Sequence, residues 1–133
     1  MSSTARCACS HISITLSGER AYHVVCHCTD CKRRTGSAFG LSLYFKRTQI
    51  VEQAGATRVY AFHNQRQDND QERHFCPICG TTLFWYTSTL PDLVGISGGC
   101  FGEESFGEPR ASYTHSKKLP WVGLPETCKA VDE

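Results

Sequence analysis

The 133-residue chain lacks the sequence features that mark membrane, nucleic-acid-binding and secreted proteins. Its formal net charge is only +1, so charge alone suggests no nucleic-acid or membrane partner. No apolar run approaches the length that crosses a bilayer, and residues 1–4 contain no apolar segment of a signal peptide. We therefore expect a cytoplasmic protein.

The chain also lacks any helical periodicity sustained over ten or more residues, and it has no internal repeat. Short stretches of alternating or apolar residues predict a mainly β fold instead. We expect strands at residues 11–16, 22–25, 41–45, 49–53, 57–62, 81–86 and 93–99. The polar stretch 64–71 predicts a surface loop. Residues 1–133 are expected to form one domain, with residues 119–133 as a tail packed on it.

Cysteine, by contrast, is abundant, with nine in the chain. An odd number without a signal peptide argues against a disulfide framework, and close Cys-x-Cys and Cys-x-x-Cys spacings favour metal binding. Residues two apart on an extended chain share a face, so Cys26 and Cys28 can reach one metal ion, with Cys31 completing a turn around it. Three protein ligands leave one position open, which is typical of a catalytic zinc site.

The number of closely spaced thiols indicates how they are divided between two metal sites. Cys7 and Cys9 offer two ligands, and the zinc-knuckle pattern Cys-Pro-x-Cys-Gly offers Cys76 and Cys79. We expect these four to form a closed structural zinc site, which gives two zinc ions per chain. In a rival partition, Cys100, Cys128 or a histidine closes the three-cysteine site. A redox pair at the knuckle is the weaker interpretation, because residues 81–86 are strand-like rather than helical.

Polar residues beside the three cysteines predict how a substrate is bound. Three consecutive cations can receive carboxylates, and the following backbone amides can add donors. The residues expected to bind the substrate are Lys32, Arg33, Arg34, Thr35 and Gly36. The cations could equally form a solvated surface run. His27 lies between two ligand positions, so we expect it to face away from the metal as a hydrogen-bonded structural histidine.

Four features together resemble the glutathione-dependent formaldehyde-activating enzyme family: the N-terminal Cys-x-Cys, the run CHCTDCKRRTGSAF at 26–39, the FCPICG knuckle at 75–80, and the late Pro120-Trp121. The resemblance implies a β-tent fold of antiparallel sheets with one structural and one catalytic zinc. It assigns Cys7, Cys9, Cys76 and Cys79 to the structural metal, and Cys26, Cys28 and Cys31 to the catalytic one. This assignment agrees with the count of thiols.

The resemblance also implies an activity, which is the condensation of glutathione with formaldehyde to S-hydroxymethylglutathione, formally a carbon–sulfur lyase run backwards. The expected partner is thus a small thiol, glutathione or an adduct of it. The chain departs from the family at Ser10, where glycine is usual, and at residues 99–102, which lack an acidic residue. The alternative function is a non-catalytic double-zinc β module that binds a protein, favoured if a fourth protein ligand closes the three-cysteine site.

Overall fold

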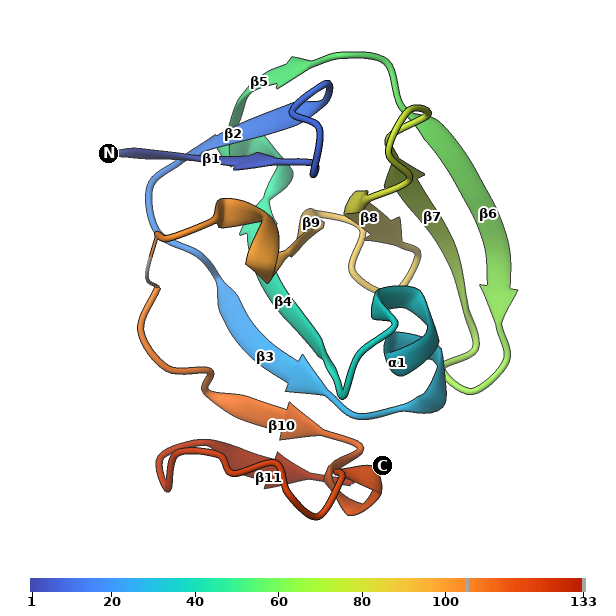
Figure 1. Cartoon of the computed structure of the whole chain (residues 1–133), viewed down its shortest axis with the longest axis vertical. Coiled ribbons are helices and arrows are strands. Elements are labelled where there is room, and N and C mark those ends of the chain that lie inside the picture. Colours follow the sequence, from blue (N-terminus) through green and yellow to red (C-terminus); the bar gives the residue numbers. More distant parts are fainter. Residues whose placement is uncertain (105, 133) are drawn as a thin grey trace.

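The computed structural model describes residues 1–104 and 106–132, and two β-sheets dominate this part of the chain (Figure 1). The smaller sheet has three antiparallel strands in the order β1-β2-β5. Its strands are β1 (Ser2–Arg6), β2 (Ser13–Ser17) and β5 (Ile50–Ala54). Strand β1 lies outside the stretches for which the sequence predicted a strand.

The larger sheet has eight strands in the order β11-β10-β3-β4-β9-β8-β7-β6. All its neighbours are antiparallel except the two pairs made by β10, which runs parallel to both β3 and β11. The strands are β3 (Tyr22–Cys26), β4 (Gly40–Lys46), β6 (Arg58–Asn64), β7 (Asn69–Phe75), β8 (Thr82–Thr87), β9 (Leu93–Ser97), β10 (Ala111–Tyr113) and β11 (Lys129–Val131). The expected mainly β fold is confirmed.

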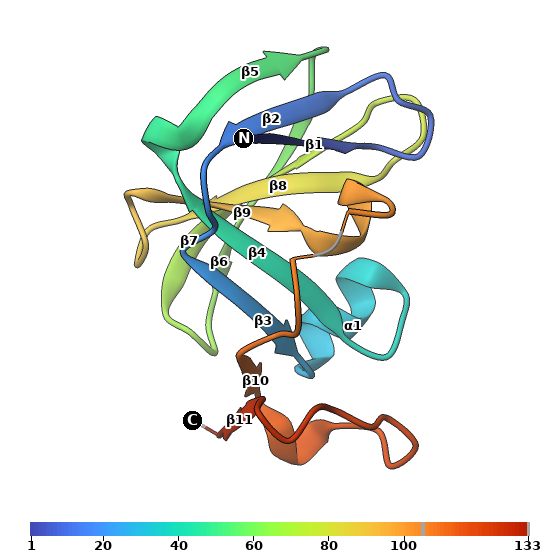
Figure 2. The same ribbon diagram turned by 90° about the vertical axis from the view of Figure 1, so that its left-hand side faces the viewer.

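Figure 2 shows the small sheet β1-β2-β5 lying over β8, β9 and β4 of the larger sheet. The buried side chains of the hydrophobic core come from both sheets. Ile14 and Leu16 of β2 and Leu43 and Phe45 of β4 are fully buried there or nearly so. Because side chains alternate along a strand, the residues between them point the other way. The opposite face of the larger sheet is therefore free to carry polar groups.

Helix α1 (Thr29–Thr35) connects β3 to β4 and is the one α-helix in residues 1–104 and 106–132. Cys28 is its N-cap, and Gly36 ends it in the left-handed conformation at φ 64°. Single 3₁₀ turns lie at η1 (Arg47–Gln49), η2 (Gly98–Phe101) and η3 (His115–Lys117). None of the described helices is long and apolar enough to span a bilayer.

The surface loop predicted at residues 64–71 is wrong for its second half. Strand β7 begins at Asn69, and only residues 65–68 form the turn that joins it to β6. Asn69 and Gln71 are buried, and the Gln71 side-chain amide donates to Asn69 Oδ1 at 3.1 Å. Polar side chains that satisfy one another can line a buried strand face, which is why composition misidentified this segment.

Candidate functional site

Four cysteines from two remote segments form the first cluster. Cys7 and Cys9 follow β1, while Cys76 and Cys79 lie between β7 and β8, and their sulfur atoms all lie within 4.8 Å of one another. The sulfur of Cys9 is 3.8 Å from that of Cys7 and 3.7 Å from that of Cys76. A tetrahedral zinc ion with Zn–S bonds of about 2.3 Å requires sulfurs about 3.8 Å apart. The donor set therefore fits zinc.

Backbone amides support this cluster in the way expected of a zinc knuckle. The N–H groups of Ile78 and Cys79 point at the Cys76 sulfur at 3.4 and 3.5 Å. Gly80, the last residue of the knuckle pattern, has a positive φ of 79°, which glycine adopts without steric cost. Hydrogen bonding from the Thr81 hydroxyl, 3.2 Å away, helps lower the pKa of Cys79 to about 5. These contacts all favour the thiolate form that a metal binds.

Cys26, Cys28 and Cys31 form the second cluster, with their sulfur atoms also within 4.8 Å of one another. Cys26 ends β3, Cys28 is the N-cap of α1, and Cys31 lies in the first turn of α1. The backbone N–H of Cys31 donates to Cys28 Sγ at 3.3 Å. Hydrogen bonds with Cys26 and Cys31 hold the pKa of Cys28 far below its ordinary value, and those with Cys26 and Cys28 raise the pKa of Cys31. Three thiols this close can all ionise only around a cation.

This second cluster gains no fourth ligand from the described residues. Over residues 1–104 and 106–132, no further histidine, cysteine or carboxylate joins the three thiols. Cys100 and Cys128 lie outside both clusters, so neither closes the site as the rival partition required. His27 is fully buried, and its Nε2 lies 2.8 Å from the Ser112 hydroxyl, which confirms the expected structural histidine.

Cys26 and Cys31 open onto a cavity of about 660 Å³, a size typical of small-molecule sites. The cavity lies against the face of the larger sheet that is turned away from the core, and α1 and the β6–β7 turn also contribute to its wall. The polar residues of its lining are Asp30, Arg34, Ser42, Tyr44, Arg66, Gln67, Asn69, Gln71, Arg73, Thr87 and Thr89, among others. One end of a polar ligand cavity thus carries the open thiol cluster.

Two aromatic side chains of the cavity wall, Tyr44 and Trp85, lie together and form an aromatic platform. Gly95 lies between Tyr44 and Trp85 in the sheet register, and a side chain at Gly95 would overlap the Trp85 indole. The indole Nε1–H donates to the Tyr44 hydroxyl at 3.2 Å, and the Arg34 guanidinium lies over the indole, 4.4 Å from its centroid. Burial raises the pKa of Tyr44, so its hydroxyl remains a proton donor.

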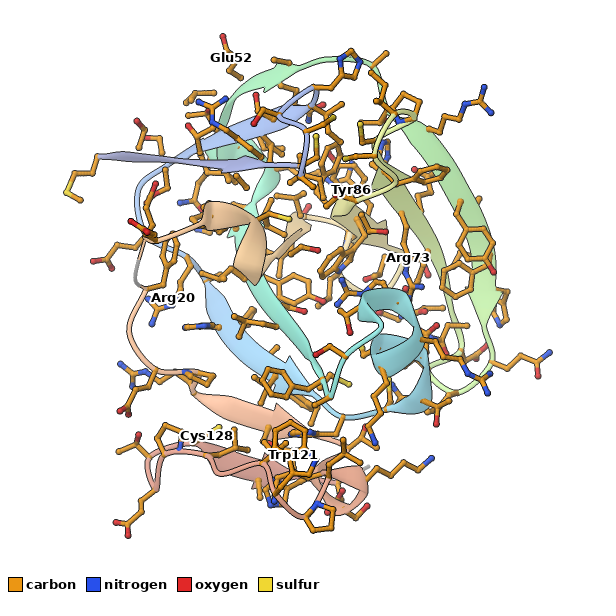
Figure 3. The ribbon with its side chains drawn as sticks, viewed as in Figure 1. Arg20, Glu52, Arg73, Tyr86, Trp121 and Cys128 are labelled. Carbon is orange, nitrogen blue, oxygen red and sulfur yellow. The ribbon has the colours of Figure 1, made fainter. Side chains whose placement is uncertain are left out.

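A partly buried ion pair joins α1 to β7 across the same wall. Arg73 of β7 binds Asp30 of α1, and Figure 3 shows the Arg73 side chain between those two elements. Arg73 also lies over the Phe62 ring. Both residues line the cavity, and the carboxylate of Asp30 neutralises the charge of Arg73. Nearby, the Thr87 hydroxyl is buried and has no hydrogen-bond partner among the residues that the structure describes.

The five residues expected to bind the substrate have different surroundings. Arg34 lines the cavity, whereas Lys32, Arg33, Thr35 and Gly36 are absent from its lining. Lys32 Nζ donates instead to the Lys117 carbonyl at 2.8 Å, and the other three are exposed. Sequence reasoning missed the platform and the polar wall of β7. The available signal was the spacing of Asn69, Gln71 and Arg73 at every second position, which places their side chains on one face of a strand.

Comparisons with known proteins agree with this architecture. The family model described as glutathione-dependent formaldehyde-activating enzyme matches residues 2–116. A Fusarium vanettenii protein named for that enzyme is 27% identical over 79 residues, which are 59% of this chain and 41% of that protein, so the chain spans about two fifths of the relative's length. A crystal structure of a Rhodobacter sphaeroides protein matches with a TM-score of 0.59 and 19% identity, covering 77% of this chain and 90% of that one, and supports the fold alone. Because the family model covers most of the chain, this protein belongs to the glutathione-dependent formaldehyde-activating enzyme family.

Proposed function

We propose that the protein is a zinc enzyme that adds glutathione to formaldehyde to give S-hydroxymethylglutathione, and catalyses the reverse carbon–sulfur cleavage. The observation that carries the proposal is the second thiol cluster, which has three sulfur ligands and faces a polar cavity. A purely structural site has no need of a ligand cavity at its open side. Family membership supports glutathione and formaldehyde as the substrates.

The two clusters would have different roles. Cys7, Cys9, Cys76 and Cys79 would hold a structural zinc that ties the segment after β1 to the β7–β8 connection. Cys26, Cys28 and Cys31 would hold the catalytic zinc, which when bound supplies a soft Lewis acid that favours ionised sulfur ligands. We therefore expect two zinc ions per chain.

Cavity residues would bind the peptide part of glutathione. Arg66 is exposed at the wall and has no acidic partner among the described residues, so it is available for a substrate carboxylate. Asn69 and Gln71 offer donors and acceptors for amide groups. Of the five residues expected from the sequence to bind the substrate, we keep only Arg34 as a residue of the active site, because it alone lines the cavity.

The reaction needs no redox partner. The S–H bond of glutathione breaks, a C–S bond forms to the formaldehyde carbon, and the π-electron pair of the carbonyl moves to oxygen, which takes the proton. The protein must hold the two reactants together and stabilise the negative charge on that oxygen.

The test combines exchange kinetics with binding. In NMR of ¹³C-formaldehyde and glutathione, the zinc-loaded protein should accelerate exchange between free and thiol-bound carbon, and Cys28→Ser should abolish the acceleration. Calorimetry should show that glutathione binds far more tightly than S-methylglutathione, whose sulfur cannot ionise. Cys128→Ser is the matched control, since Cys128 belongs to neither cluster, and it should behave as wild type. Equal binding of both peptides would overturn the proposal and favour the protein-binding module.

A further inference from the structure

Arg34 is placed next to the thiol cluster by the helix that carries it. It follows Cys31 by three residues in α1, so both lie on one side of the helix. A Cβ at Gly40 would be 2.6 Å from Arg34 Nη2 and 3.5 Å from Cys31 Sγ, so these two atoms lie within about 6 Å of each other. The charged end of Arg34 is thus beside the sulfur cluster rather than at the far end of the cavity.

Several contacts fix this guanidinium in one orientation. The guanidinium lies over the Trp85 indole, with Cζ 4.4 Å from the ring centroid, and Nη1 donates to the Ser97 hydroxyl at 3.2 Å. Ser97 in turn donates to the Thr82 carbonyl at 2.7 Å, which orients the hydroxyl as an acceptor for Arg34. Gly40 leaves the space that Nη2 occupies, because a side chain there would collide with it. A group held this way is preorganised before any ligand arrives.

Most of the donors of Arg34 remain available. A guanidinium has five N–H groups, and in the described part of the chain only the bond to Ser97 uses one of them. No carboxylate among the described residues pairs with Arg34, in contrast to Arg73, which binds Asp30. A half-buried cation in a cavity without a counter-ion is suited to an anionic ligand.

We infer that Arg34 is a catalytic residue whose guanidinium binds an oxyanion one carbon away from a sulfur held at the Cys26–Cys28–Cys31 cluster. This inference rests on the proposed function and identifies the group that stabilises the oxygen of formaldehyde. As the C–S bond forms, the carbonyl π-electron pair moves to oxygen, and Arg34 donates hydrogen bonds to it until it takes its proton. The peptide carboxylates of glutathione are many more bonds away from the sulfur than the formaldehyde oxygen is. They would therefore be bound by other cavity residues, such as Arg66.

The experiment compares two small thiols on the zinc-loaded protein. Mercaptoacetate carries an anionic oxygen close to its sulfur, and ethanethiol is a neutral thiol of similar size. Calorimetry should give wild type at least a tenfold preference for mercaptoacetate, and Arg34→Gln should reduce the preference to about one while the affinity for ethanethiol is unchanged. Arg58→Gln, which removes an exposed arginine of β6 away from the cavity, should retain the preference.

Kinetics provide the second readout. Arg34→Gln should lower kcat for the glutathione–formaldehyde reaction by about 10²–10³-fold with little change in KM for glutathione, as expected for loss of one oxyanion donor. Arg34→Lys keeps the charge but loses the planar fork, and should recover only part of the rate. A large rise in KM with unchanged kcat would instead place Arg34 on a peptide carboxylate and overturn the inference.

Acetate separates this inference from the proposed function. Having no thiol, it should bind weakly to wild type and not measurably to Arg34→Gln. If acetate binds in this way but neither thiol does, the oxyanion site stands and the proposed thiol chemistry fails. If the thiols bind with the same preference in Arg34→Gln as in wild type, the proposed function survives and the role of Arg34 is refuted. If Arg34→Gln lowers the affinity for mercaptoacetate and for ethanethiol equally, Arg34 only supports the structure of the thiol cluster. That result would also refute its role as an oxyanion donor.

Discussion

Gly95→Ala tests whether the cavity wall is built as the structure has it. Gly95 of β9 is paired with Tyr44 on one side and Trp85 on the other, and the indole lies over its Cα. An alanine Cβ would overlap Nε1, Cε2 and Cδ1 of Trp85. These atoms belong to a rigid ring held on both sides, so the indole must move away from the sheet.

The expected cost follows from what the indole loses. Overpacking a filled site costs about 1–3 kcal/mol. Moving the indole to relieve the overlap gives up its hydrogen bond to Tyr44, worth about 1 kcal/mol, and its contact with Arg34, worth about 0.5–1 kcal/mol. The overpacking cost and the lost contacts are not additive, because moving the indole reduces the overlap. We therefore expect the free energy of unfolding to fall by roughly 2–3 kcal/mol. For a chain of this length, that lowers Tm by about 7–11 °C.

Thermal unfolding followed by circular dichroism at fixed free zinc measures this change, and near-ultraviolet dichroism reports the environment of Trp85. Gly99→Ala is the matched control, because a Cβ at Gly99 would meet no atom of the described residues within 4 Å, its chain neighbours apart. Gly95→Ala should also diminish the preference for mercaptoacetate, since Arg34 loses the indole on which it lies. A Tm within about 2 °C of wild type and an unchanged near-ultraviolet spectrum would refute the packing of the Trp85 indole over Gly95.

Three further outcomes are expected. Cys76→Ser should unfold or aggregate the protein, whereas Cys28→Ser should leave it folded with one zinc ion instead of two; equal damage in melting and metal analysis would contradict the division into structural and catalytic sites. Ser10→Gly should raise the free energy of unfolding by about 0.5–1 kcal/mol in urea titration, because Ser10 holds φ at 65°, and no gain would refute strain there. His63 Nδ1–H donates a hydrogen bond to Asp70 Oδ1, which raises the pKa of His63 above 6.5, so the contribution of this bond to stability should be present below pH 6.5 and lost as the pH rises through the folded pKa; NMR titration should show a lower pKa of His63 in Asp70→Asn.

The grouping of the cysteines was accessible from the sequence because ligand spacing is a local property. Cys26 and Cys28 lie on extended chain and Cys31 follows at knuckle spacing, so three residues close in sequence must also be close in space. The four-thiol site joins segments almost 70 residues apart. It could be predicted only because seven thiols divide in one simple way into four and three, and the structure brings together the same two groups.

The polar half of the cavity could not be predicted in this way. Trp85 belongs to a strand that the sequence did indicate, yet its place over Gly95 depends on the register of three strands. Asn69 and Gln71 were assigned to solvent because polar composition predicts exposure when no partner is known. Their partners come from the fold: Gln71 donates to Asn69, and Asn69 donates to Gln67 in the turn before β7 and to Thr89 after β8.

The alternation of side chains along β3 explains how stability and chemistry share one strand. Val25 points into the core and is almost fully buried, whereas Val24 and Cys26 line the cavity. The same alternation on β4 places Phe45 in the core and Tyr44 in the cavity. A cavity with an open metal-ligating cluster can therefore vary its polar residues without disturbing the packed face. The constraint on that variation lies at positions such as Gly95, where a residue of the sheet must remain small for the cavity wall to keep its shape.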